Sequence, residues 1–193
     1  MALADGPGWA HLCIDVQRMF AEETPWQAPW LKRVLPAIEE LAGRMAERTV
    51  FTRFQPPRGG DDVPGAWRTY YDRWPEMVGE RLDPSMRELV PALSRFVPPG
   101  RVFDKPIYSP WLSGELHRFL RKDAVERVII SGGESDICVL ATVLGAIDLG
   151  YHVVLPLDAL FGSADETHDA VLDIYRSRFQ TQLTITSVAE LLG

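Results

Sequence analysis

The chain has 193 residues, 46% of them hydrophobic and 24% charged, and 27 Asp and Glu outweigh 20 Lys and Arg to give a net charge of −7. This length fits one domain over residues 1–193 better than two. The acidic balance argues against partners such as nucleic acid or an anionic membrane, because both need a basic surface. We expect a cytoplasmic protein, because the sequence has neither a long apolar run that would span a bilayer nor a signal-peptide pattern. The two cysteines, Cys13 and Cys138, are too few for a disulfide framework.

Strand and helix patterns alternate along the chain. A buried strand is expected over 9–16, an amphipathic helix between Pro29 and Arg48, and a second strand over 49–54. Residues 55–65 are rich in Pro, Gly and Asp and predict a loop, and 66–79 predicts a short helix with an aromatic face. The second half predicts strands over 101–105, 127–131, 151–155 and 183–186, and helices near 113–122, over 138–149, from a capping box at Ser163 to about Arg178, and over 188–192.

Strands that alternate with helices predict βαβ units. We therefore expect a single-domain, three-layer α/β/α fold of the Rossmann-like type, with a six-stranded, mostly parallel sheet. Ligands of such sheets bind beyond the carboxyl ends of the strands. The residues to examine are therefore Asp15, Arg53, Lys105 and the turn after Ser131.

Cys138 follows a Gly-rich turn and begins a predicted helix, where the helix dipole favours a thiolate and lowers the thiol pKa. A lone cysteine is more often a buried structural residue, and we assign that role to Cys13 in mid-strand. Asp15 alone is equally well explained as a loop cap. Lys105 is more informative. Only three of the twenty basic residues are lysines, so a lysine rather than an arginine at this strand end indicates that a compact positive charge is needed there.

Taken together, these residues form an ordered set. Asp15 lies at the end of the first strand, Lys105 ends the third, and Cys138 follows the fourth. A carboxylate can take the thiol proton, an ammonium can hold that carboxylate, and backbone N–H groups of the turn can receive an oxyanion.

Three segments carry a family resemblance: Cys13-Ile14-Asp15-Val16-Gln17, Asp104 to Trp111, and Ser131 to Val139. In this order and spacing they resemble the isochorismatase-like cysteine hydrolases, above all the amidohydrolase branch with N-carbamoylsarcosine amidase and related ureide and amide hydrolases. The resemblance covers nearly the whole chain apart from 55–100. It implies the isochorismatase-like hydrolase fold, with Cys138 as nucleophile, Asp15 as general base and Lys105 in support, cleaving a C–N bond of a small amide or ureide through a thioester.

The resemblance also implies a homo-oligomer, dimer or tetramer, and a non-proline cis peptide at Gly133–Glu134. The N–H groups of Glu134 and Cys138 would then form the oxyanion hole. Family members commonly carry a bulkier aliphatic residue at position 133. With Gly there, the alternative is a trans bond with positive φ.

Nicotinamidases of this family have an Asp-x-His metal motif after the second strand, where this chain reads Thr52-Arg53-Phe54-Gln55-Pro56. The four histidines do not cluster in sequence. We therefore expect no metal and no cofactor. The Gly132-Gly133 turn matches neither a P-loop nor a dinucleotide fingerprint.

The candidates for substrate binding are less specific. Arg53 fits either a substrate carboxylate or a surface ion pair, and the aromatic run from Trp67 to Trp74 fits either a lid or a partner surface. The other candidates near the expected pocket are Gln17, Phe20, Trp26, Phe54, Tyr108 and Trp111. Two further functions stay open: a vinyl-ether hydrolase of the isochorismatase type, in which Cys138 is incidental, and a catalytically silent binding protein.

Overall fold

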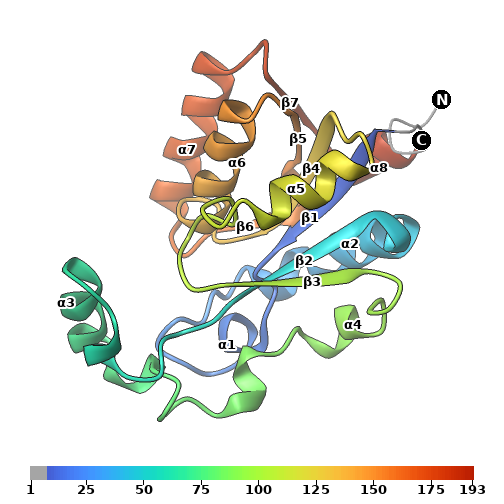
Figure 1. Cartoon of the computed structure of the whole chain (residues 1–193). Coiled ribbons are helices and arrows are strands. Elements are labelled where there is room, and N and C mark those ends of the chain that lie inside the picture. The colour runs from blue at the N-terminus through green and yellow to red at the C-terminus, as the bar shows by residue number, and fades with distance from the viewer. Residues whose placement is uncertain (1–7) are drawn as a thin grey trace.

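The structure is a computed structural model that describes residues 8–193 (Figure 1). Its centre is a seven-stranded sheet with the order β3-β2-β1-β4-β5-β7, and β6 pairs with β4 beside β5. Every pairing between these strands is parallel. The strands are β1 (Trp9–Ile14), β2 (Thr49–Phe54), β3 (Arg101–Lys105), β4 (Arg127–Gly133), β5 (His152–Pro156), β6 (Leu160–Phe161) and β7 (Leu183–Thr186).

Helices cover both faces of the sheet. They are α1 (Arg18–Ala21), α2 (Leu31–Arg44), α3 (Ala66–Arg73), α4 (Pro91–Ser94), α5 (Glu115–Lys122), α6 (Cys138–Asp148), α7 (Asp165–Arg178) and α8 (Val188–Leu192). Short 3₁₀ turns lie at Ala46–Arg48, Gly60–Asp62, Pro75–Met77, Pro84–Arg87 and Leu157–Ala159. One hydrophobic cluster joins α2 and α8 to the sheet, and a second joins α5, α6 and α7 to it. The predicted three-layer α/β/α architecture is confirmed. None of the helices over residues 8–193 has the length and apolar character to cross a membrane.

The predicted strands are all present, and β6 is the additional one. It has only two residues, Leu160 and Phe161, and a strand this short shows no alternation of apolar and polar residues from which it could be predicted. The predicted capping box at Ser163 is wrong, because the helix is capped at Ala164 and the Ser163 hydroxyl lies 3.3 Å from Asp136 Oδ2 instead. A capping box does form at Ser187, ahead of α8.

A polar tie crosses the centre of the sheet. His11 of β1 is fully buried, and its ring nitrogens lie 3.0 Å from Thr49 Oγ1 of β2 and 2.7 Å from Ser131 Oγ of β4. Burial lowers the His11 pKa to about 3, so the ring is neutral. Its hydrogen bonds satisfy the polar atoms that three neighbouring strands place in the core.

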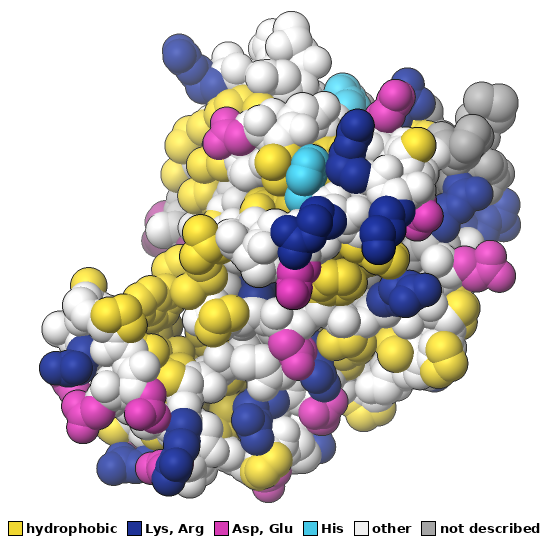
Figure 2. All heavy atoms as spheres, in the orientation of Figure 1, with side chains coloured by type: hydrophobic (Ala, Val, Ile, Leu, Met, Phe, Trp, Pro, Cys, Tyr) yellow, Lys and Arg dark blue, Asp and Glu magenta, His cyan; other side chains and the backbone are white. Residues whose placement is uncertain are grey.

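Residues 55–100 form an arm between β2 and the edge strand β3. Figure 1 shows its helix α3 standing away from the sheet, beyond the ends of β2 and β3. The helix predicted over 66–79 ends at Arg73, since Pro75 cannot continue it and begins a 3₁₀ turn. In Figure 2 hydrophobic side chains run from this arm towards the side that carries α6 and α7. The arm is thus joined to the body through apolar contacts.

Candidate active site

Asp15, Lys105 and Cys138 meet at the carboxyl edge of the sheet. Asp15 directly follows β1, Lys105 is the last residue of β3, and Cys138 is the first of α6. The Lys105 Nζ lies 2.6 Å from Asp15 Oδ2 and 3.6 Å from Cys138 Sγ. All three side chains are buried. This buried ion pair differs from a solvated surface pair, and it places a candidate base and a candidate nucleophile side by side.

Asp15 is held in a demanding backbone conformation. Its φ is +49°, a left-handed region that side chains other than Gly rarely adopt. The Thr52 hydroxyl donates to Asp15 Oδ1 at 2.6 Å, and the Asp15 N–H donates to the Thr52 carbonyl at 3.2 Å. Thr52 therefore orients the carboxylate that Lys105 contacts. Sequence patterns did not single out Thr52, although its place near the end of the strand beside β1 was a usable signal.

Lys105 is fixed from several sides. Its ammonium also donates to the Ile107 carbonyl at 3.1 Å and lies 5.3 Å from the centre of the Phe54 ring. Burial pulls the Lys105 pKa down, but Asp15 and the Cys138 sulfur together raise it above its ordinary value. Lys105 is thus a permanent cation beside the thiol.

The expected lowering of the Cys138 pKa is wrong. Burial and then the Asp15 carboxylate raise the pKa of this thiol well above its ordinary value, and the opposing effect of Lys105 does not compensate. The start of α6 does not outweigh the loss of water and the adjacent negative charge. The resting sulfur is a neutral thiol, so any attack by it needs a base at the moment of reaction.

The turn before α6 brings two backbone N–H groups to the site. The Gly133–Glu134 peptide bond is cis. A Cβ at Gly133 would lie 2.2 Å from the Phe161 ring, which explains why this chain has no bulkier residue there. Within residues 8–193, neither the Glu134 N–H nor the Cys138 N–H has a protein acceptor. Both residues line the cavity beside the thiol.

A cavity of about 360 Å³ lies against Cys138. Phe20 and Tyr108, two of the residues expected to bind substrate, line it. Six aromatic side chains share its wall: Phe20, Trp26, Phe54, Tyr70, Trp74 and Tyr108. Tyr70 and Trp74 come from the arm, so part of the aromatic run from Trp67 to Trp74 builds this cavity.

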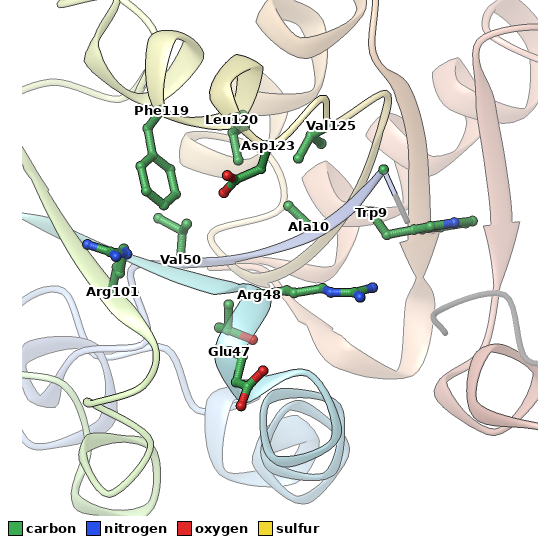
Figure 3. A pocket seen from close by; sticks show the side chains of 12 residues that line it. Trp9, Ala10, Glu47, Arg48, Val50, Arg101, Phe119, Leu120, Asp123 and Val125 are labelled. Atoms are coloured by element: carbon green, nitrogen blue, oxygen red, sulfur yellow. The ribbon is translucent and has the colours of Figure 1, made fainter. Parts of the chain in front are cut away.

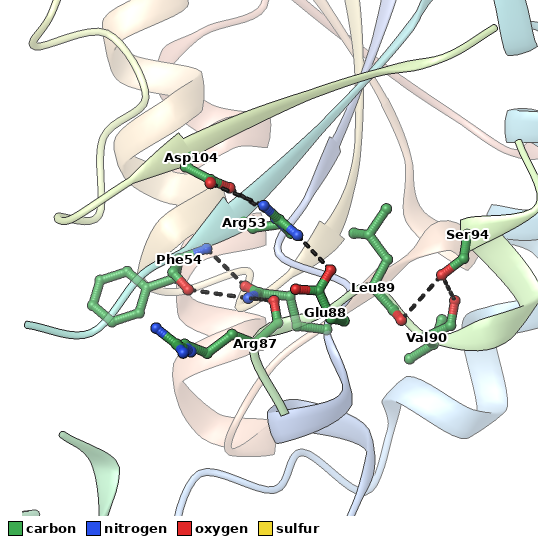
Figure 4. Close-up of polar contacts among 9 residues, drawn as sticks. Arg53, Phe54, Arg87, Glu88, Leu89, Val90, Ser94 and Asp104 are labelled. Atoms are coloured by element: carbon green, nitrogen blue, oxygen red, sulfur yellow. Dashed lines mark hydrogen bonds and ion pairs between the residues drawn. The ribbon is translucent and has the colours of Figure 1, made fainter. Parts of the chain in front are cut away.

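Three other residues expected to bind substrate lie elsewhere. Figure 4 shows Arg53 between Asp104 and Glu88. Its guanidinium donates to both Asp104 carboxylate oxygens, at 2.7 and 2.9 Å, and it also pairs with Glu88. Arg53 and Asp104 stand opposite each other in the β2–β3 register, which explains the pair. Arg53 is therefore a partner in an ion pair and not a substrate ligand.

Gln17 and Trp111 have structural roles. The Gln17 amide accepts from the Phe54 N–H at 2.7 Å and donates to the Phe54 and Arg87 carbonyls, at 3.0 and 2.6 Å. The buried Trp111 indole donates to the Thr142 carbonyl at 2.9 Å and packs under α6. Neither residue lines the cavity at Cys138.

The histidines are spread over the molecule. His11 lies in the core. His117 lies beside Tyr151, His152 beside Thr184 and His168 beside Ser135. In the part of the chain that the structure describes, no group of three or more His, Cys, Asp or Glu side chains could hold a metal ion.

A second cavity, of about 240 Å³, lies at the opposite edge of the sheet (Figure 3). The first residues of β1, β2 and β3 line it, together with Phe119 and Asp123. None of the three predicted catalytic residues reaches it.

The molecule is thus a three-layer parallel α/β protein that holds a cysteine, an aspartate and a lysine together at the carboxyl edge of its sheet. Residues 9–187 match the family model described as Isochorismatase domain, and the chain belongs to this isochorismatase family. A curated relative from Arabidopsis thaliana, named "Probable inactive nicotinamidase", is 30% identical over 172 residues, which cover 86% of this chain and 87% of the relative.

Two solved structures share the fold. A cysteine hydrolase from Pseudomonas syringae superposes with a TM-score of 0.79 at 21% identity, over 96% of this chain and 91% of that one. An N-carbamoylsarcosine amidase from Thermoplasma acidophilum superposes with a TM-score of 0.77 at 18% identity, over 96% and 99% of the two chains.

Proposed function

We propose that the protein is a cysteine-dependent amidohydrolase that cleaves a C–N bond of a small amide or ureide. The contact of Lys105 with both Asp15 Oδ2 and Cys138 Sγ carries this proposal. It supplies a nucleophile, a base and a fixed cation within one buried cluster beside a cavity.

In the first half-reaction the Asp15 carboxylate takes the thiol proton as Cys138 Sγ bonds to the carbonyl carbon. The carbonyl π electrons move to oxygen, and the N–H groups of Glu134 and Cys138 stabilise the resulting oxyanion. The oxyanion collapses, the C–N bond breaks, and Asp15 returns its proton to the departing nitrogen. Ammonia or an amine leaves, and Cys138 carries a thioester, or a thiocarbamate where the substrate is a ureide.

In the second half-reaction Asp15 removes a proton from water, whose oxygen bonds to the same carbon. The C–S bond breaks, and the proton passes from Asp15 to the leaving sulfur. Lys105 keeps the carboxylate in place throughout and offsets the negative charge near the sulfur. These reaction steps need no metal and no cofactor.

The test is a panel of small amides and ureides assayed for released ammonia. We expect turnover that survives dialysis against a chelator and disappears in Cys138→Ala. Turnover that Cys138→Ala retains favours the vinyl-ether alternative. Loss on chelation that zinc or iron restores shows a metal requirement. A relative named as inactive makes the silent alternative concrete, and ammonia release by this chain excludes it.

We further propose a homo-oligomer, dimer or tetramer, in the cytoplasm. Leu112 is 80% exposed and Leu144 on α6 is 39% exposed, which gives the α6 side an apolar surface. Both cysteines are unpaired, which suits a reducing compartment. Light scattering at micromolar concentration tests the assembly, and a strictly monomeric mass contradicts it.

A further inference from the structure

The cavity beside Cys138 has an unusual combination of walls. Its aromatic side chains contact one another without a ligand. The centre of the Trp26 ring lies 5.9 Å from the ring centres of both Phe54 and Tyr70, and 6.3 Å from that of Phe20. The centre of the Tyr108 ring lies 4.9 Å from that of the Trp67 ring. The rings therefore form a box whose shape is set by the protein.

One carboxyl group lines this box. Glu134 is half-buried, between β4 and α6, and the same cavity takes in Cys138. Its charge acts on Tyr70, Tyr108 and the Cys138 thiol, so all four groups lie within electrostatic range of one another. Burial raises the Glu134 pKa to about 7, with further increases from Asp136 and Asp15 and a decrease from the Ser163 hydroxyl.

No cation in residues 8–193 neutralises Glu134. The charged groups that shift its pKa, Asp136 and Asp15, are acidic themselves. Lys105 is already engaged by Asp15 and the Cys138 sulfur. Arg73 also lines the cavity, but it is exposed and its guanidinium lies over the Trp74 ring, 5.3 Å from its centre. A half-buried carboxylate without a cationic partner is costly, and a positively charged ligand could supply the missing partner.

Aromatic faces and a carboxylate attract the same kind of group. The ring quadrupole favours a cation over its face, and most of all a quaternary ammonium, which cannot be satisfied by hydrogen bonds. A neutral group of the same shape gains only the apolar contact, and an anion is repelled by Glu134.

We propose that the cavity selects amides that carry a small cationic nitrogen, quaternary or tertiary, within a few atoms of the scissile carbonyl, with the aromatic box around the cation and the Glu134 carboxylate beside it. This inference rests on the proposed amidohydrolase function and names its substrate class. It makes Glu134 a specificity-determining residue through its side chain, separate from the role of its backbone N–H.

The first test compares two isosteres. Betaine amide and 3,3-dimethylbutanamide have the same shape and differ by one positive charge, and malonamate supplies a negative one. At pH 8 we expect kcat/KM for betaine amide to exceed that for its neutral isostere about tenfold, with malonamate lowest. Equal values for the two isosteres, or a preference for malonamate, overturn the proposal.

Variants assign the preference to a residue. In Glu134→Gln the ratio of the two kcat/KM values falls towards one, whatever happens to the rates themselves, and the aromatic faces account for the preference that is left. The matched control is Glu76→Gln, which removes the same charge from an exposed position on the arm, outside the cavity, and keeps the ratio. Arg73→Gln increases the ratio, because it removes a positive charge from the wall. A ratio that Glu134→Gln leaves unchanged overturns the assignment.

The quaternary ammonium does not titrate, so a pH profile reports on the protein. KM for betaine amide falls between pH 6 and pH 8 as Glu134 ionises, while KM for the neutral isostere does not follow that change. In Glu134→Gln the two profiles run parallel. Parallel profiles in the wild-type protein contradict the proposal, because the remaining titratable groups at the cavity act on both substrates.

Binding separates this proposal from the proposed function. Tetramethylammonium chloride should raise the melting temperature above that in sodium chloride of equal ionic strength, and the shift should become smaller in Glu134→Gln. If no amide in the wider panel is hydrolysed but the shift occurs, the cation site stands and the amidohydrolase function fails. If amides are hydrolysed without cation preference or thermal shift, the function stands and the cation site fails.

Discussion

The two edges of the sheet each carry a cavity, but the charged side chains are buried at one edge and exposed at the other. At the carboxyl edge Asp15 is completely buried and Lys105 is 4% exposed, in direct contact with a thiol. At the amino edge Arg101 and Asp123 line the cavity of Figure 3 as exposed side chains. Removing charges from water costs several kcal/mol per ion, whereas exposed charges cost little. A cavity alone therefore does not mark a site, and the buried charges are what distinguish the carboxyl edge.

The largest effect should come from Cys138 and Asp15. Cys138→Ala removes the proposed nucleophile and should lower kcat by about 10⁵-fold or more, and Asp15→Asn removes the proposed base and should cost about 10³–10⁴-fold. Single-turnover kinetics on the best amide of the panel measure both losses, with circular dichroism as the control for folding. A folded Asp15→Asn variant of near wild-type rate would mean that another group takes the thiol proton.

The next effect separates stability from activity. Lys105→Met leaves Asp15 buried without its partner and should lower the free energy of unfolding by about 3–5 kcal/mol. The double variant Asp15→Asn, Lys105→Met removes both charges and should recover most of that stability without recovering turnover. Urea denaturation measures the first quantity, and ammonia release the second. If the double variant is as unstable as the sum of the singles, the pair is not coupled as its 2.6 Å contact requires.

The two cysteines should react in a fixed order. Cys138 lines the cavity, while Cys13 lies in β1 with no exposed surface, and burial raises its pKa to about 12. Brief iodoacetamide treatment should therefore alkylate Cys138 and leave Cys13 unmodified. Because the Cys138 pKa is raised, the rate should increase as the pH rises above neutral. Peptide mapping by mass spectrometry identifies the site, and labelling of Cys13 first would refute the assignment of the reactive thiol.

A smaller effect concerns pH and Glu134. Burial raises its pKa in the folded state to about 7, so the folded protein holds this proton more tightly than the unfolded chain. The stabilising contribution is fully present below the unfolded pKa of about 4.3 and is lost as the pH rises through 7. Glu134→Gln should accordingly raise the melting temperature at pH 8, with a gain that shrinks towards pH 5. Glu76→Gln should show no such trend, and a constant difference for Glu134→Gln would contradict the shifted pKa.

The smallest effect is expected at the amino edge. Arg101→Gln removes an exposed charge that lies over the Phe119 ring and should change the free energy of unfolding by about 0.5 kcal/mol or less. The kcat/KM on the best amide should stay at the wild-type value. A large loss of activity in this variant would show that the cavity of Figure 3 takes part in function, and the contrast between the two edges would fail.

Sequence patterns predicted the features that depend on chain order. Apolar runs marked six strands, and the parallel topology placed their carboxyl ends together, so Asp15, Lys105 and Cys138 were identified before their contacts were known. Features that depend on register were missed. Arg53 and Asp104 face each other only because β2 and β3 pair as they do, and this pairing takes Arg53 out of the substrate site.

The balance of opposing effects was also beyond the sequence. A helix start and a lysine both favour a thiolate at Cys138, but the degree of burial and the position of Asp15 decide the outcome, and both are three-dimensional. The aromatic run from Trp67 to Trp74 predicted a contact surface but did not indicate its position in the fold. Only the fold shows that Tyr70 and Trp74 form part of the wall of the cavity at Cys138.

The place of the arm in the chain has an evolutionary consequence. It leaves the sheet after Phe54 and returns at Arg101, and β2 and β3, which it connects, are hydrogen-bonded neighbours with β3 at the edge. The entropy of closing such a connection grows only slowly with its length, so changes of length in the exposed parts of the arm cost the fold little, whereas Met77, Leu82 and Leu93 belong to the hydrophobic core and constrain it. Asp15, Lys105 and Cys138 all lie outside the arm. Related chains can therefore differ at Tyr70, Arg73 and Trp74, the residues of the arm that line the cavity, while Asp15, Lys105 and Cys138 keep their places at the edge of the sheet.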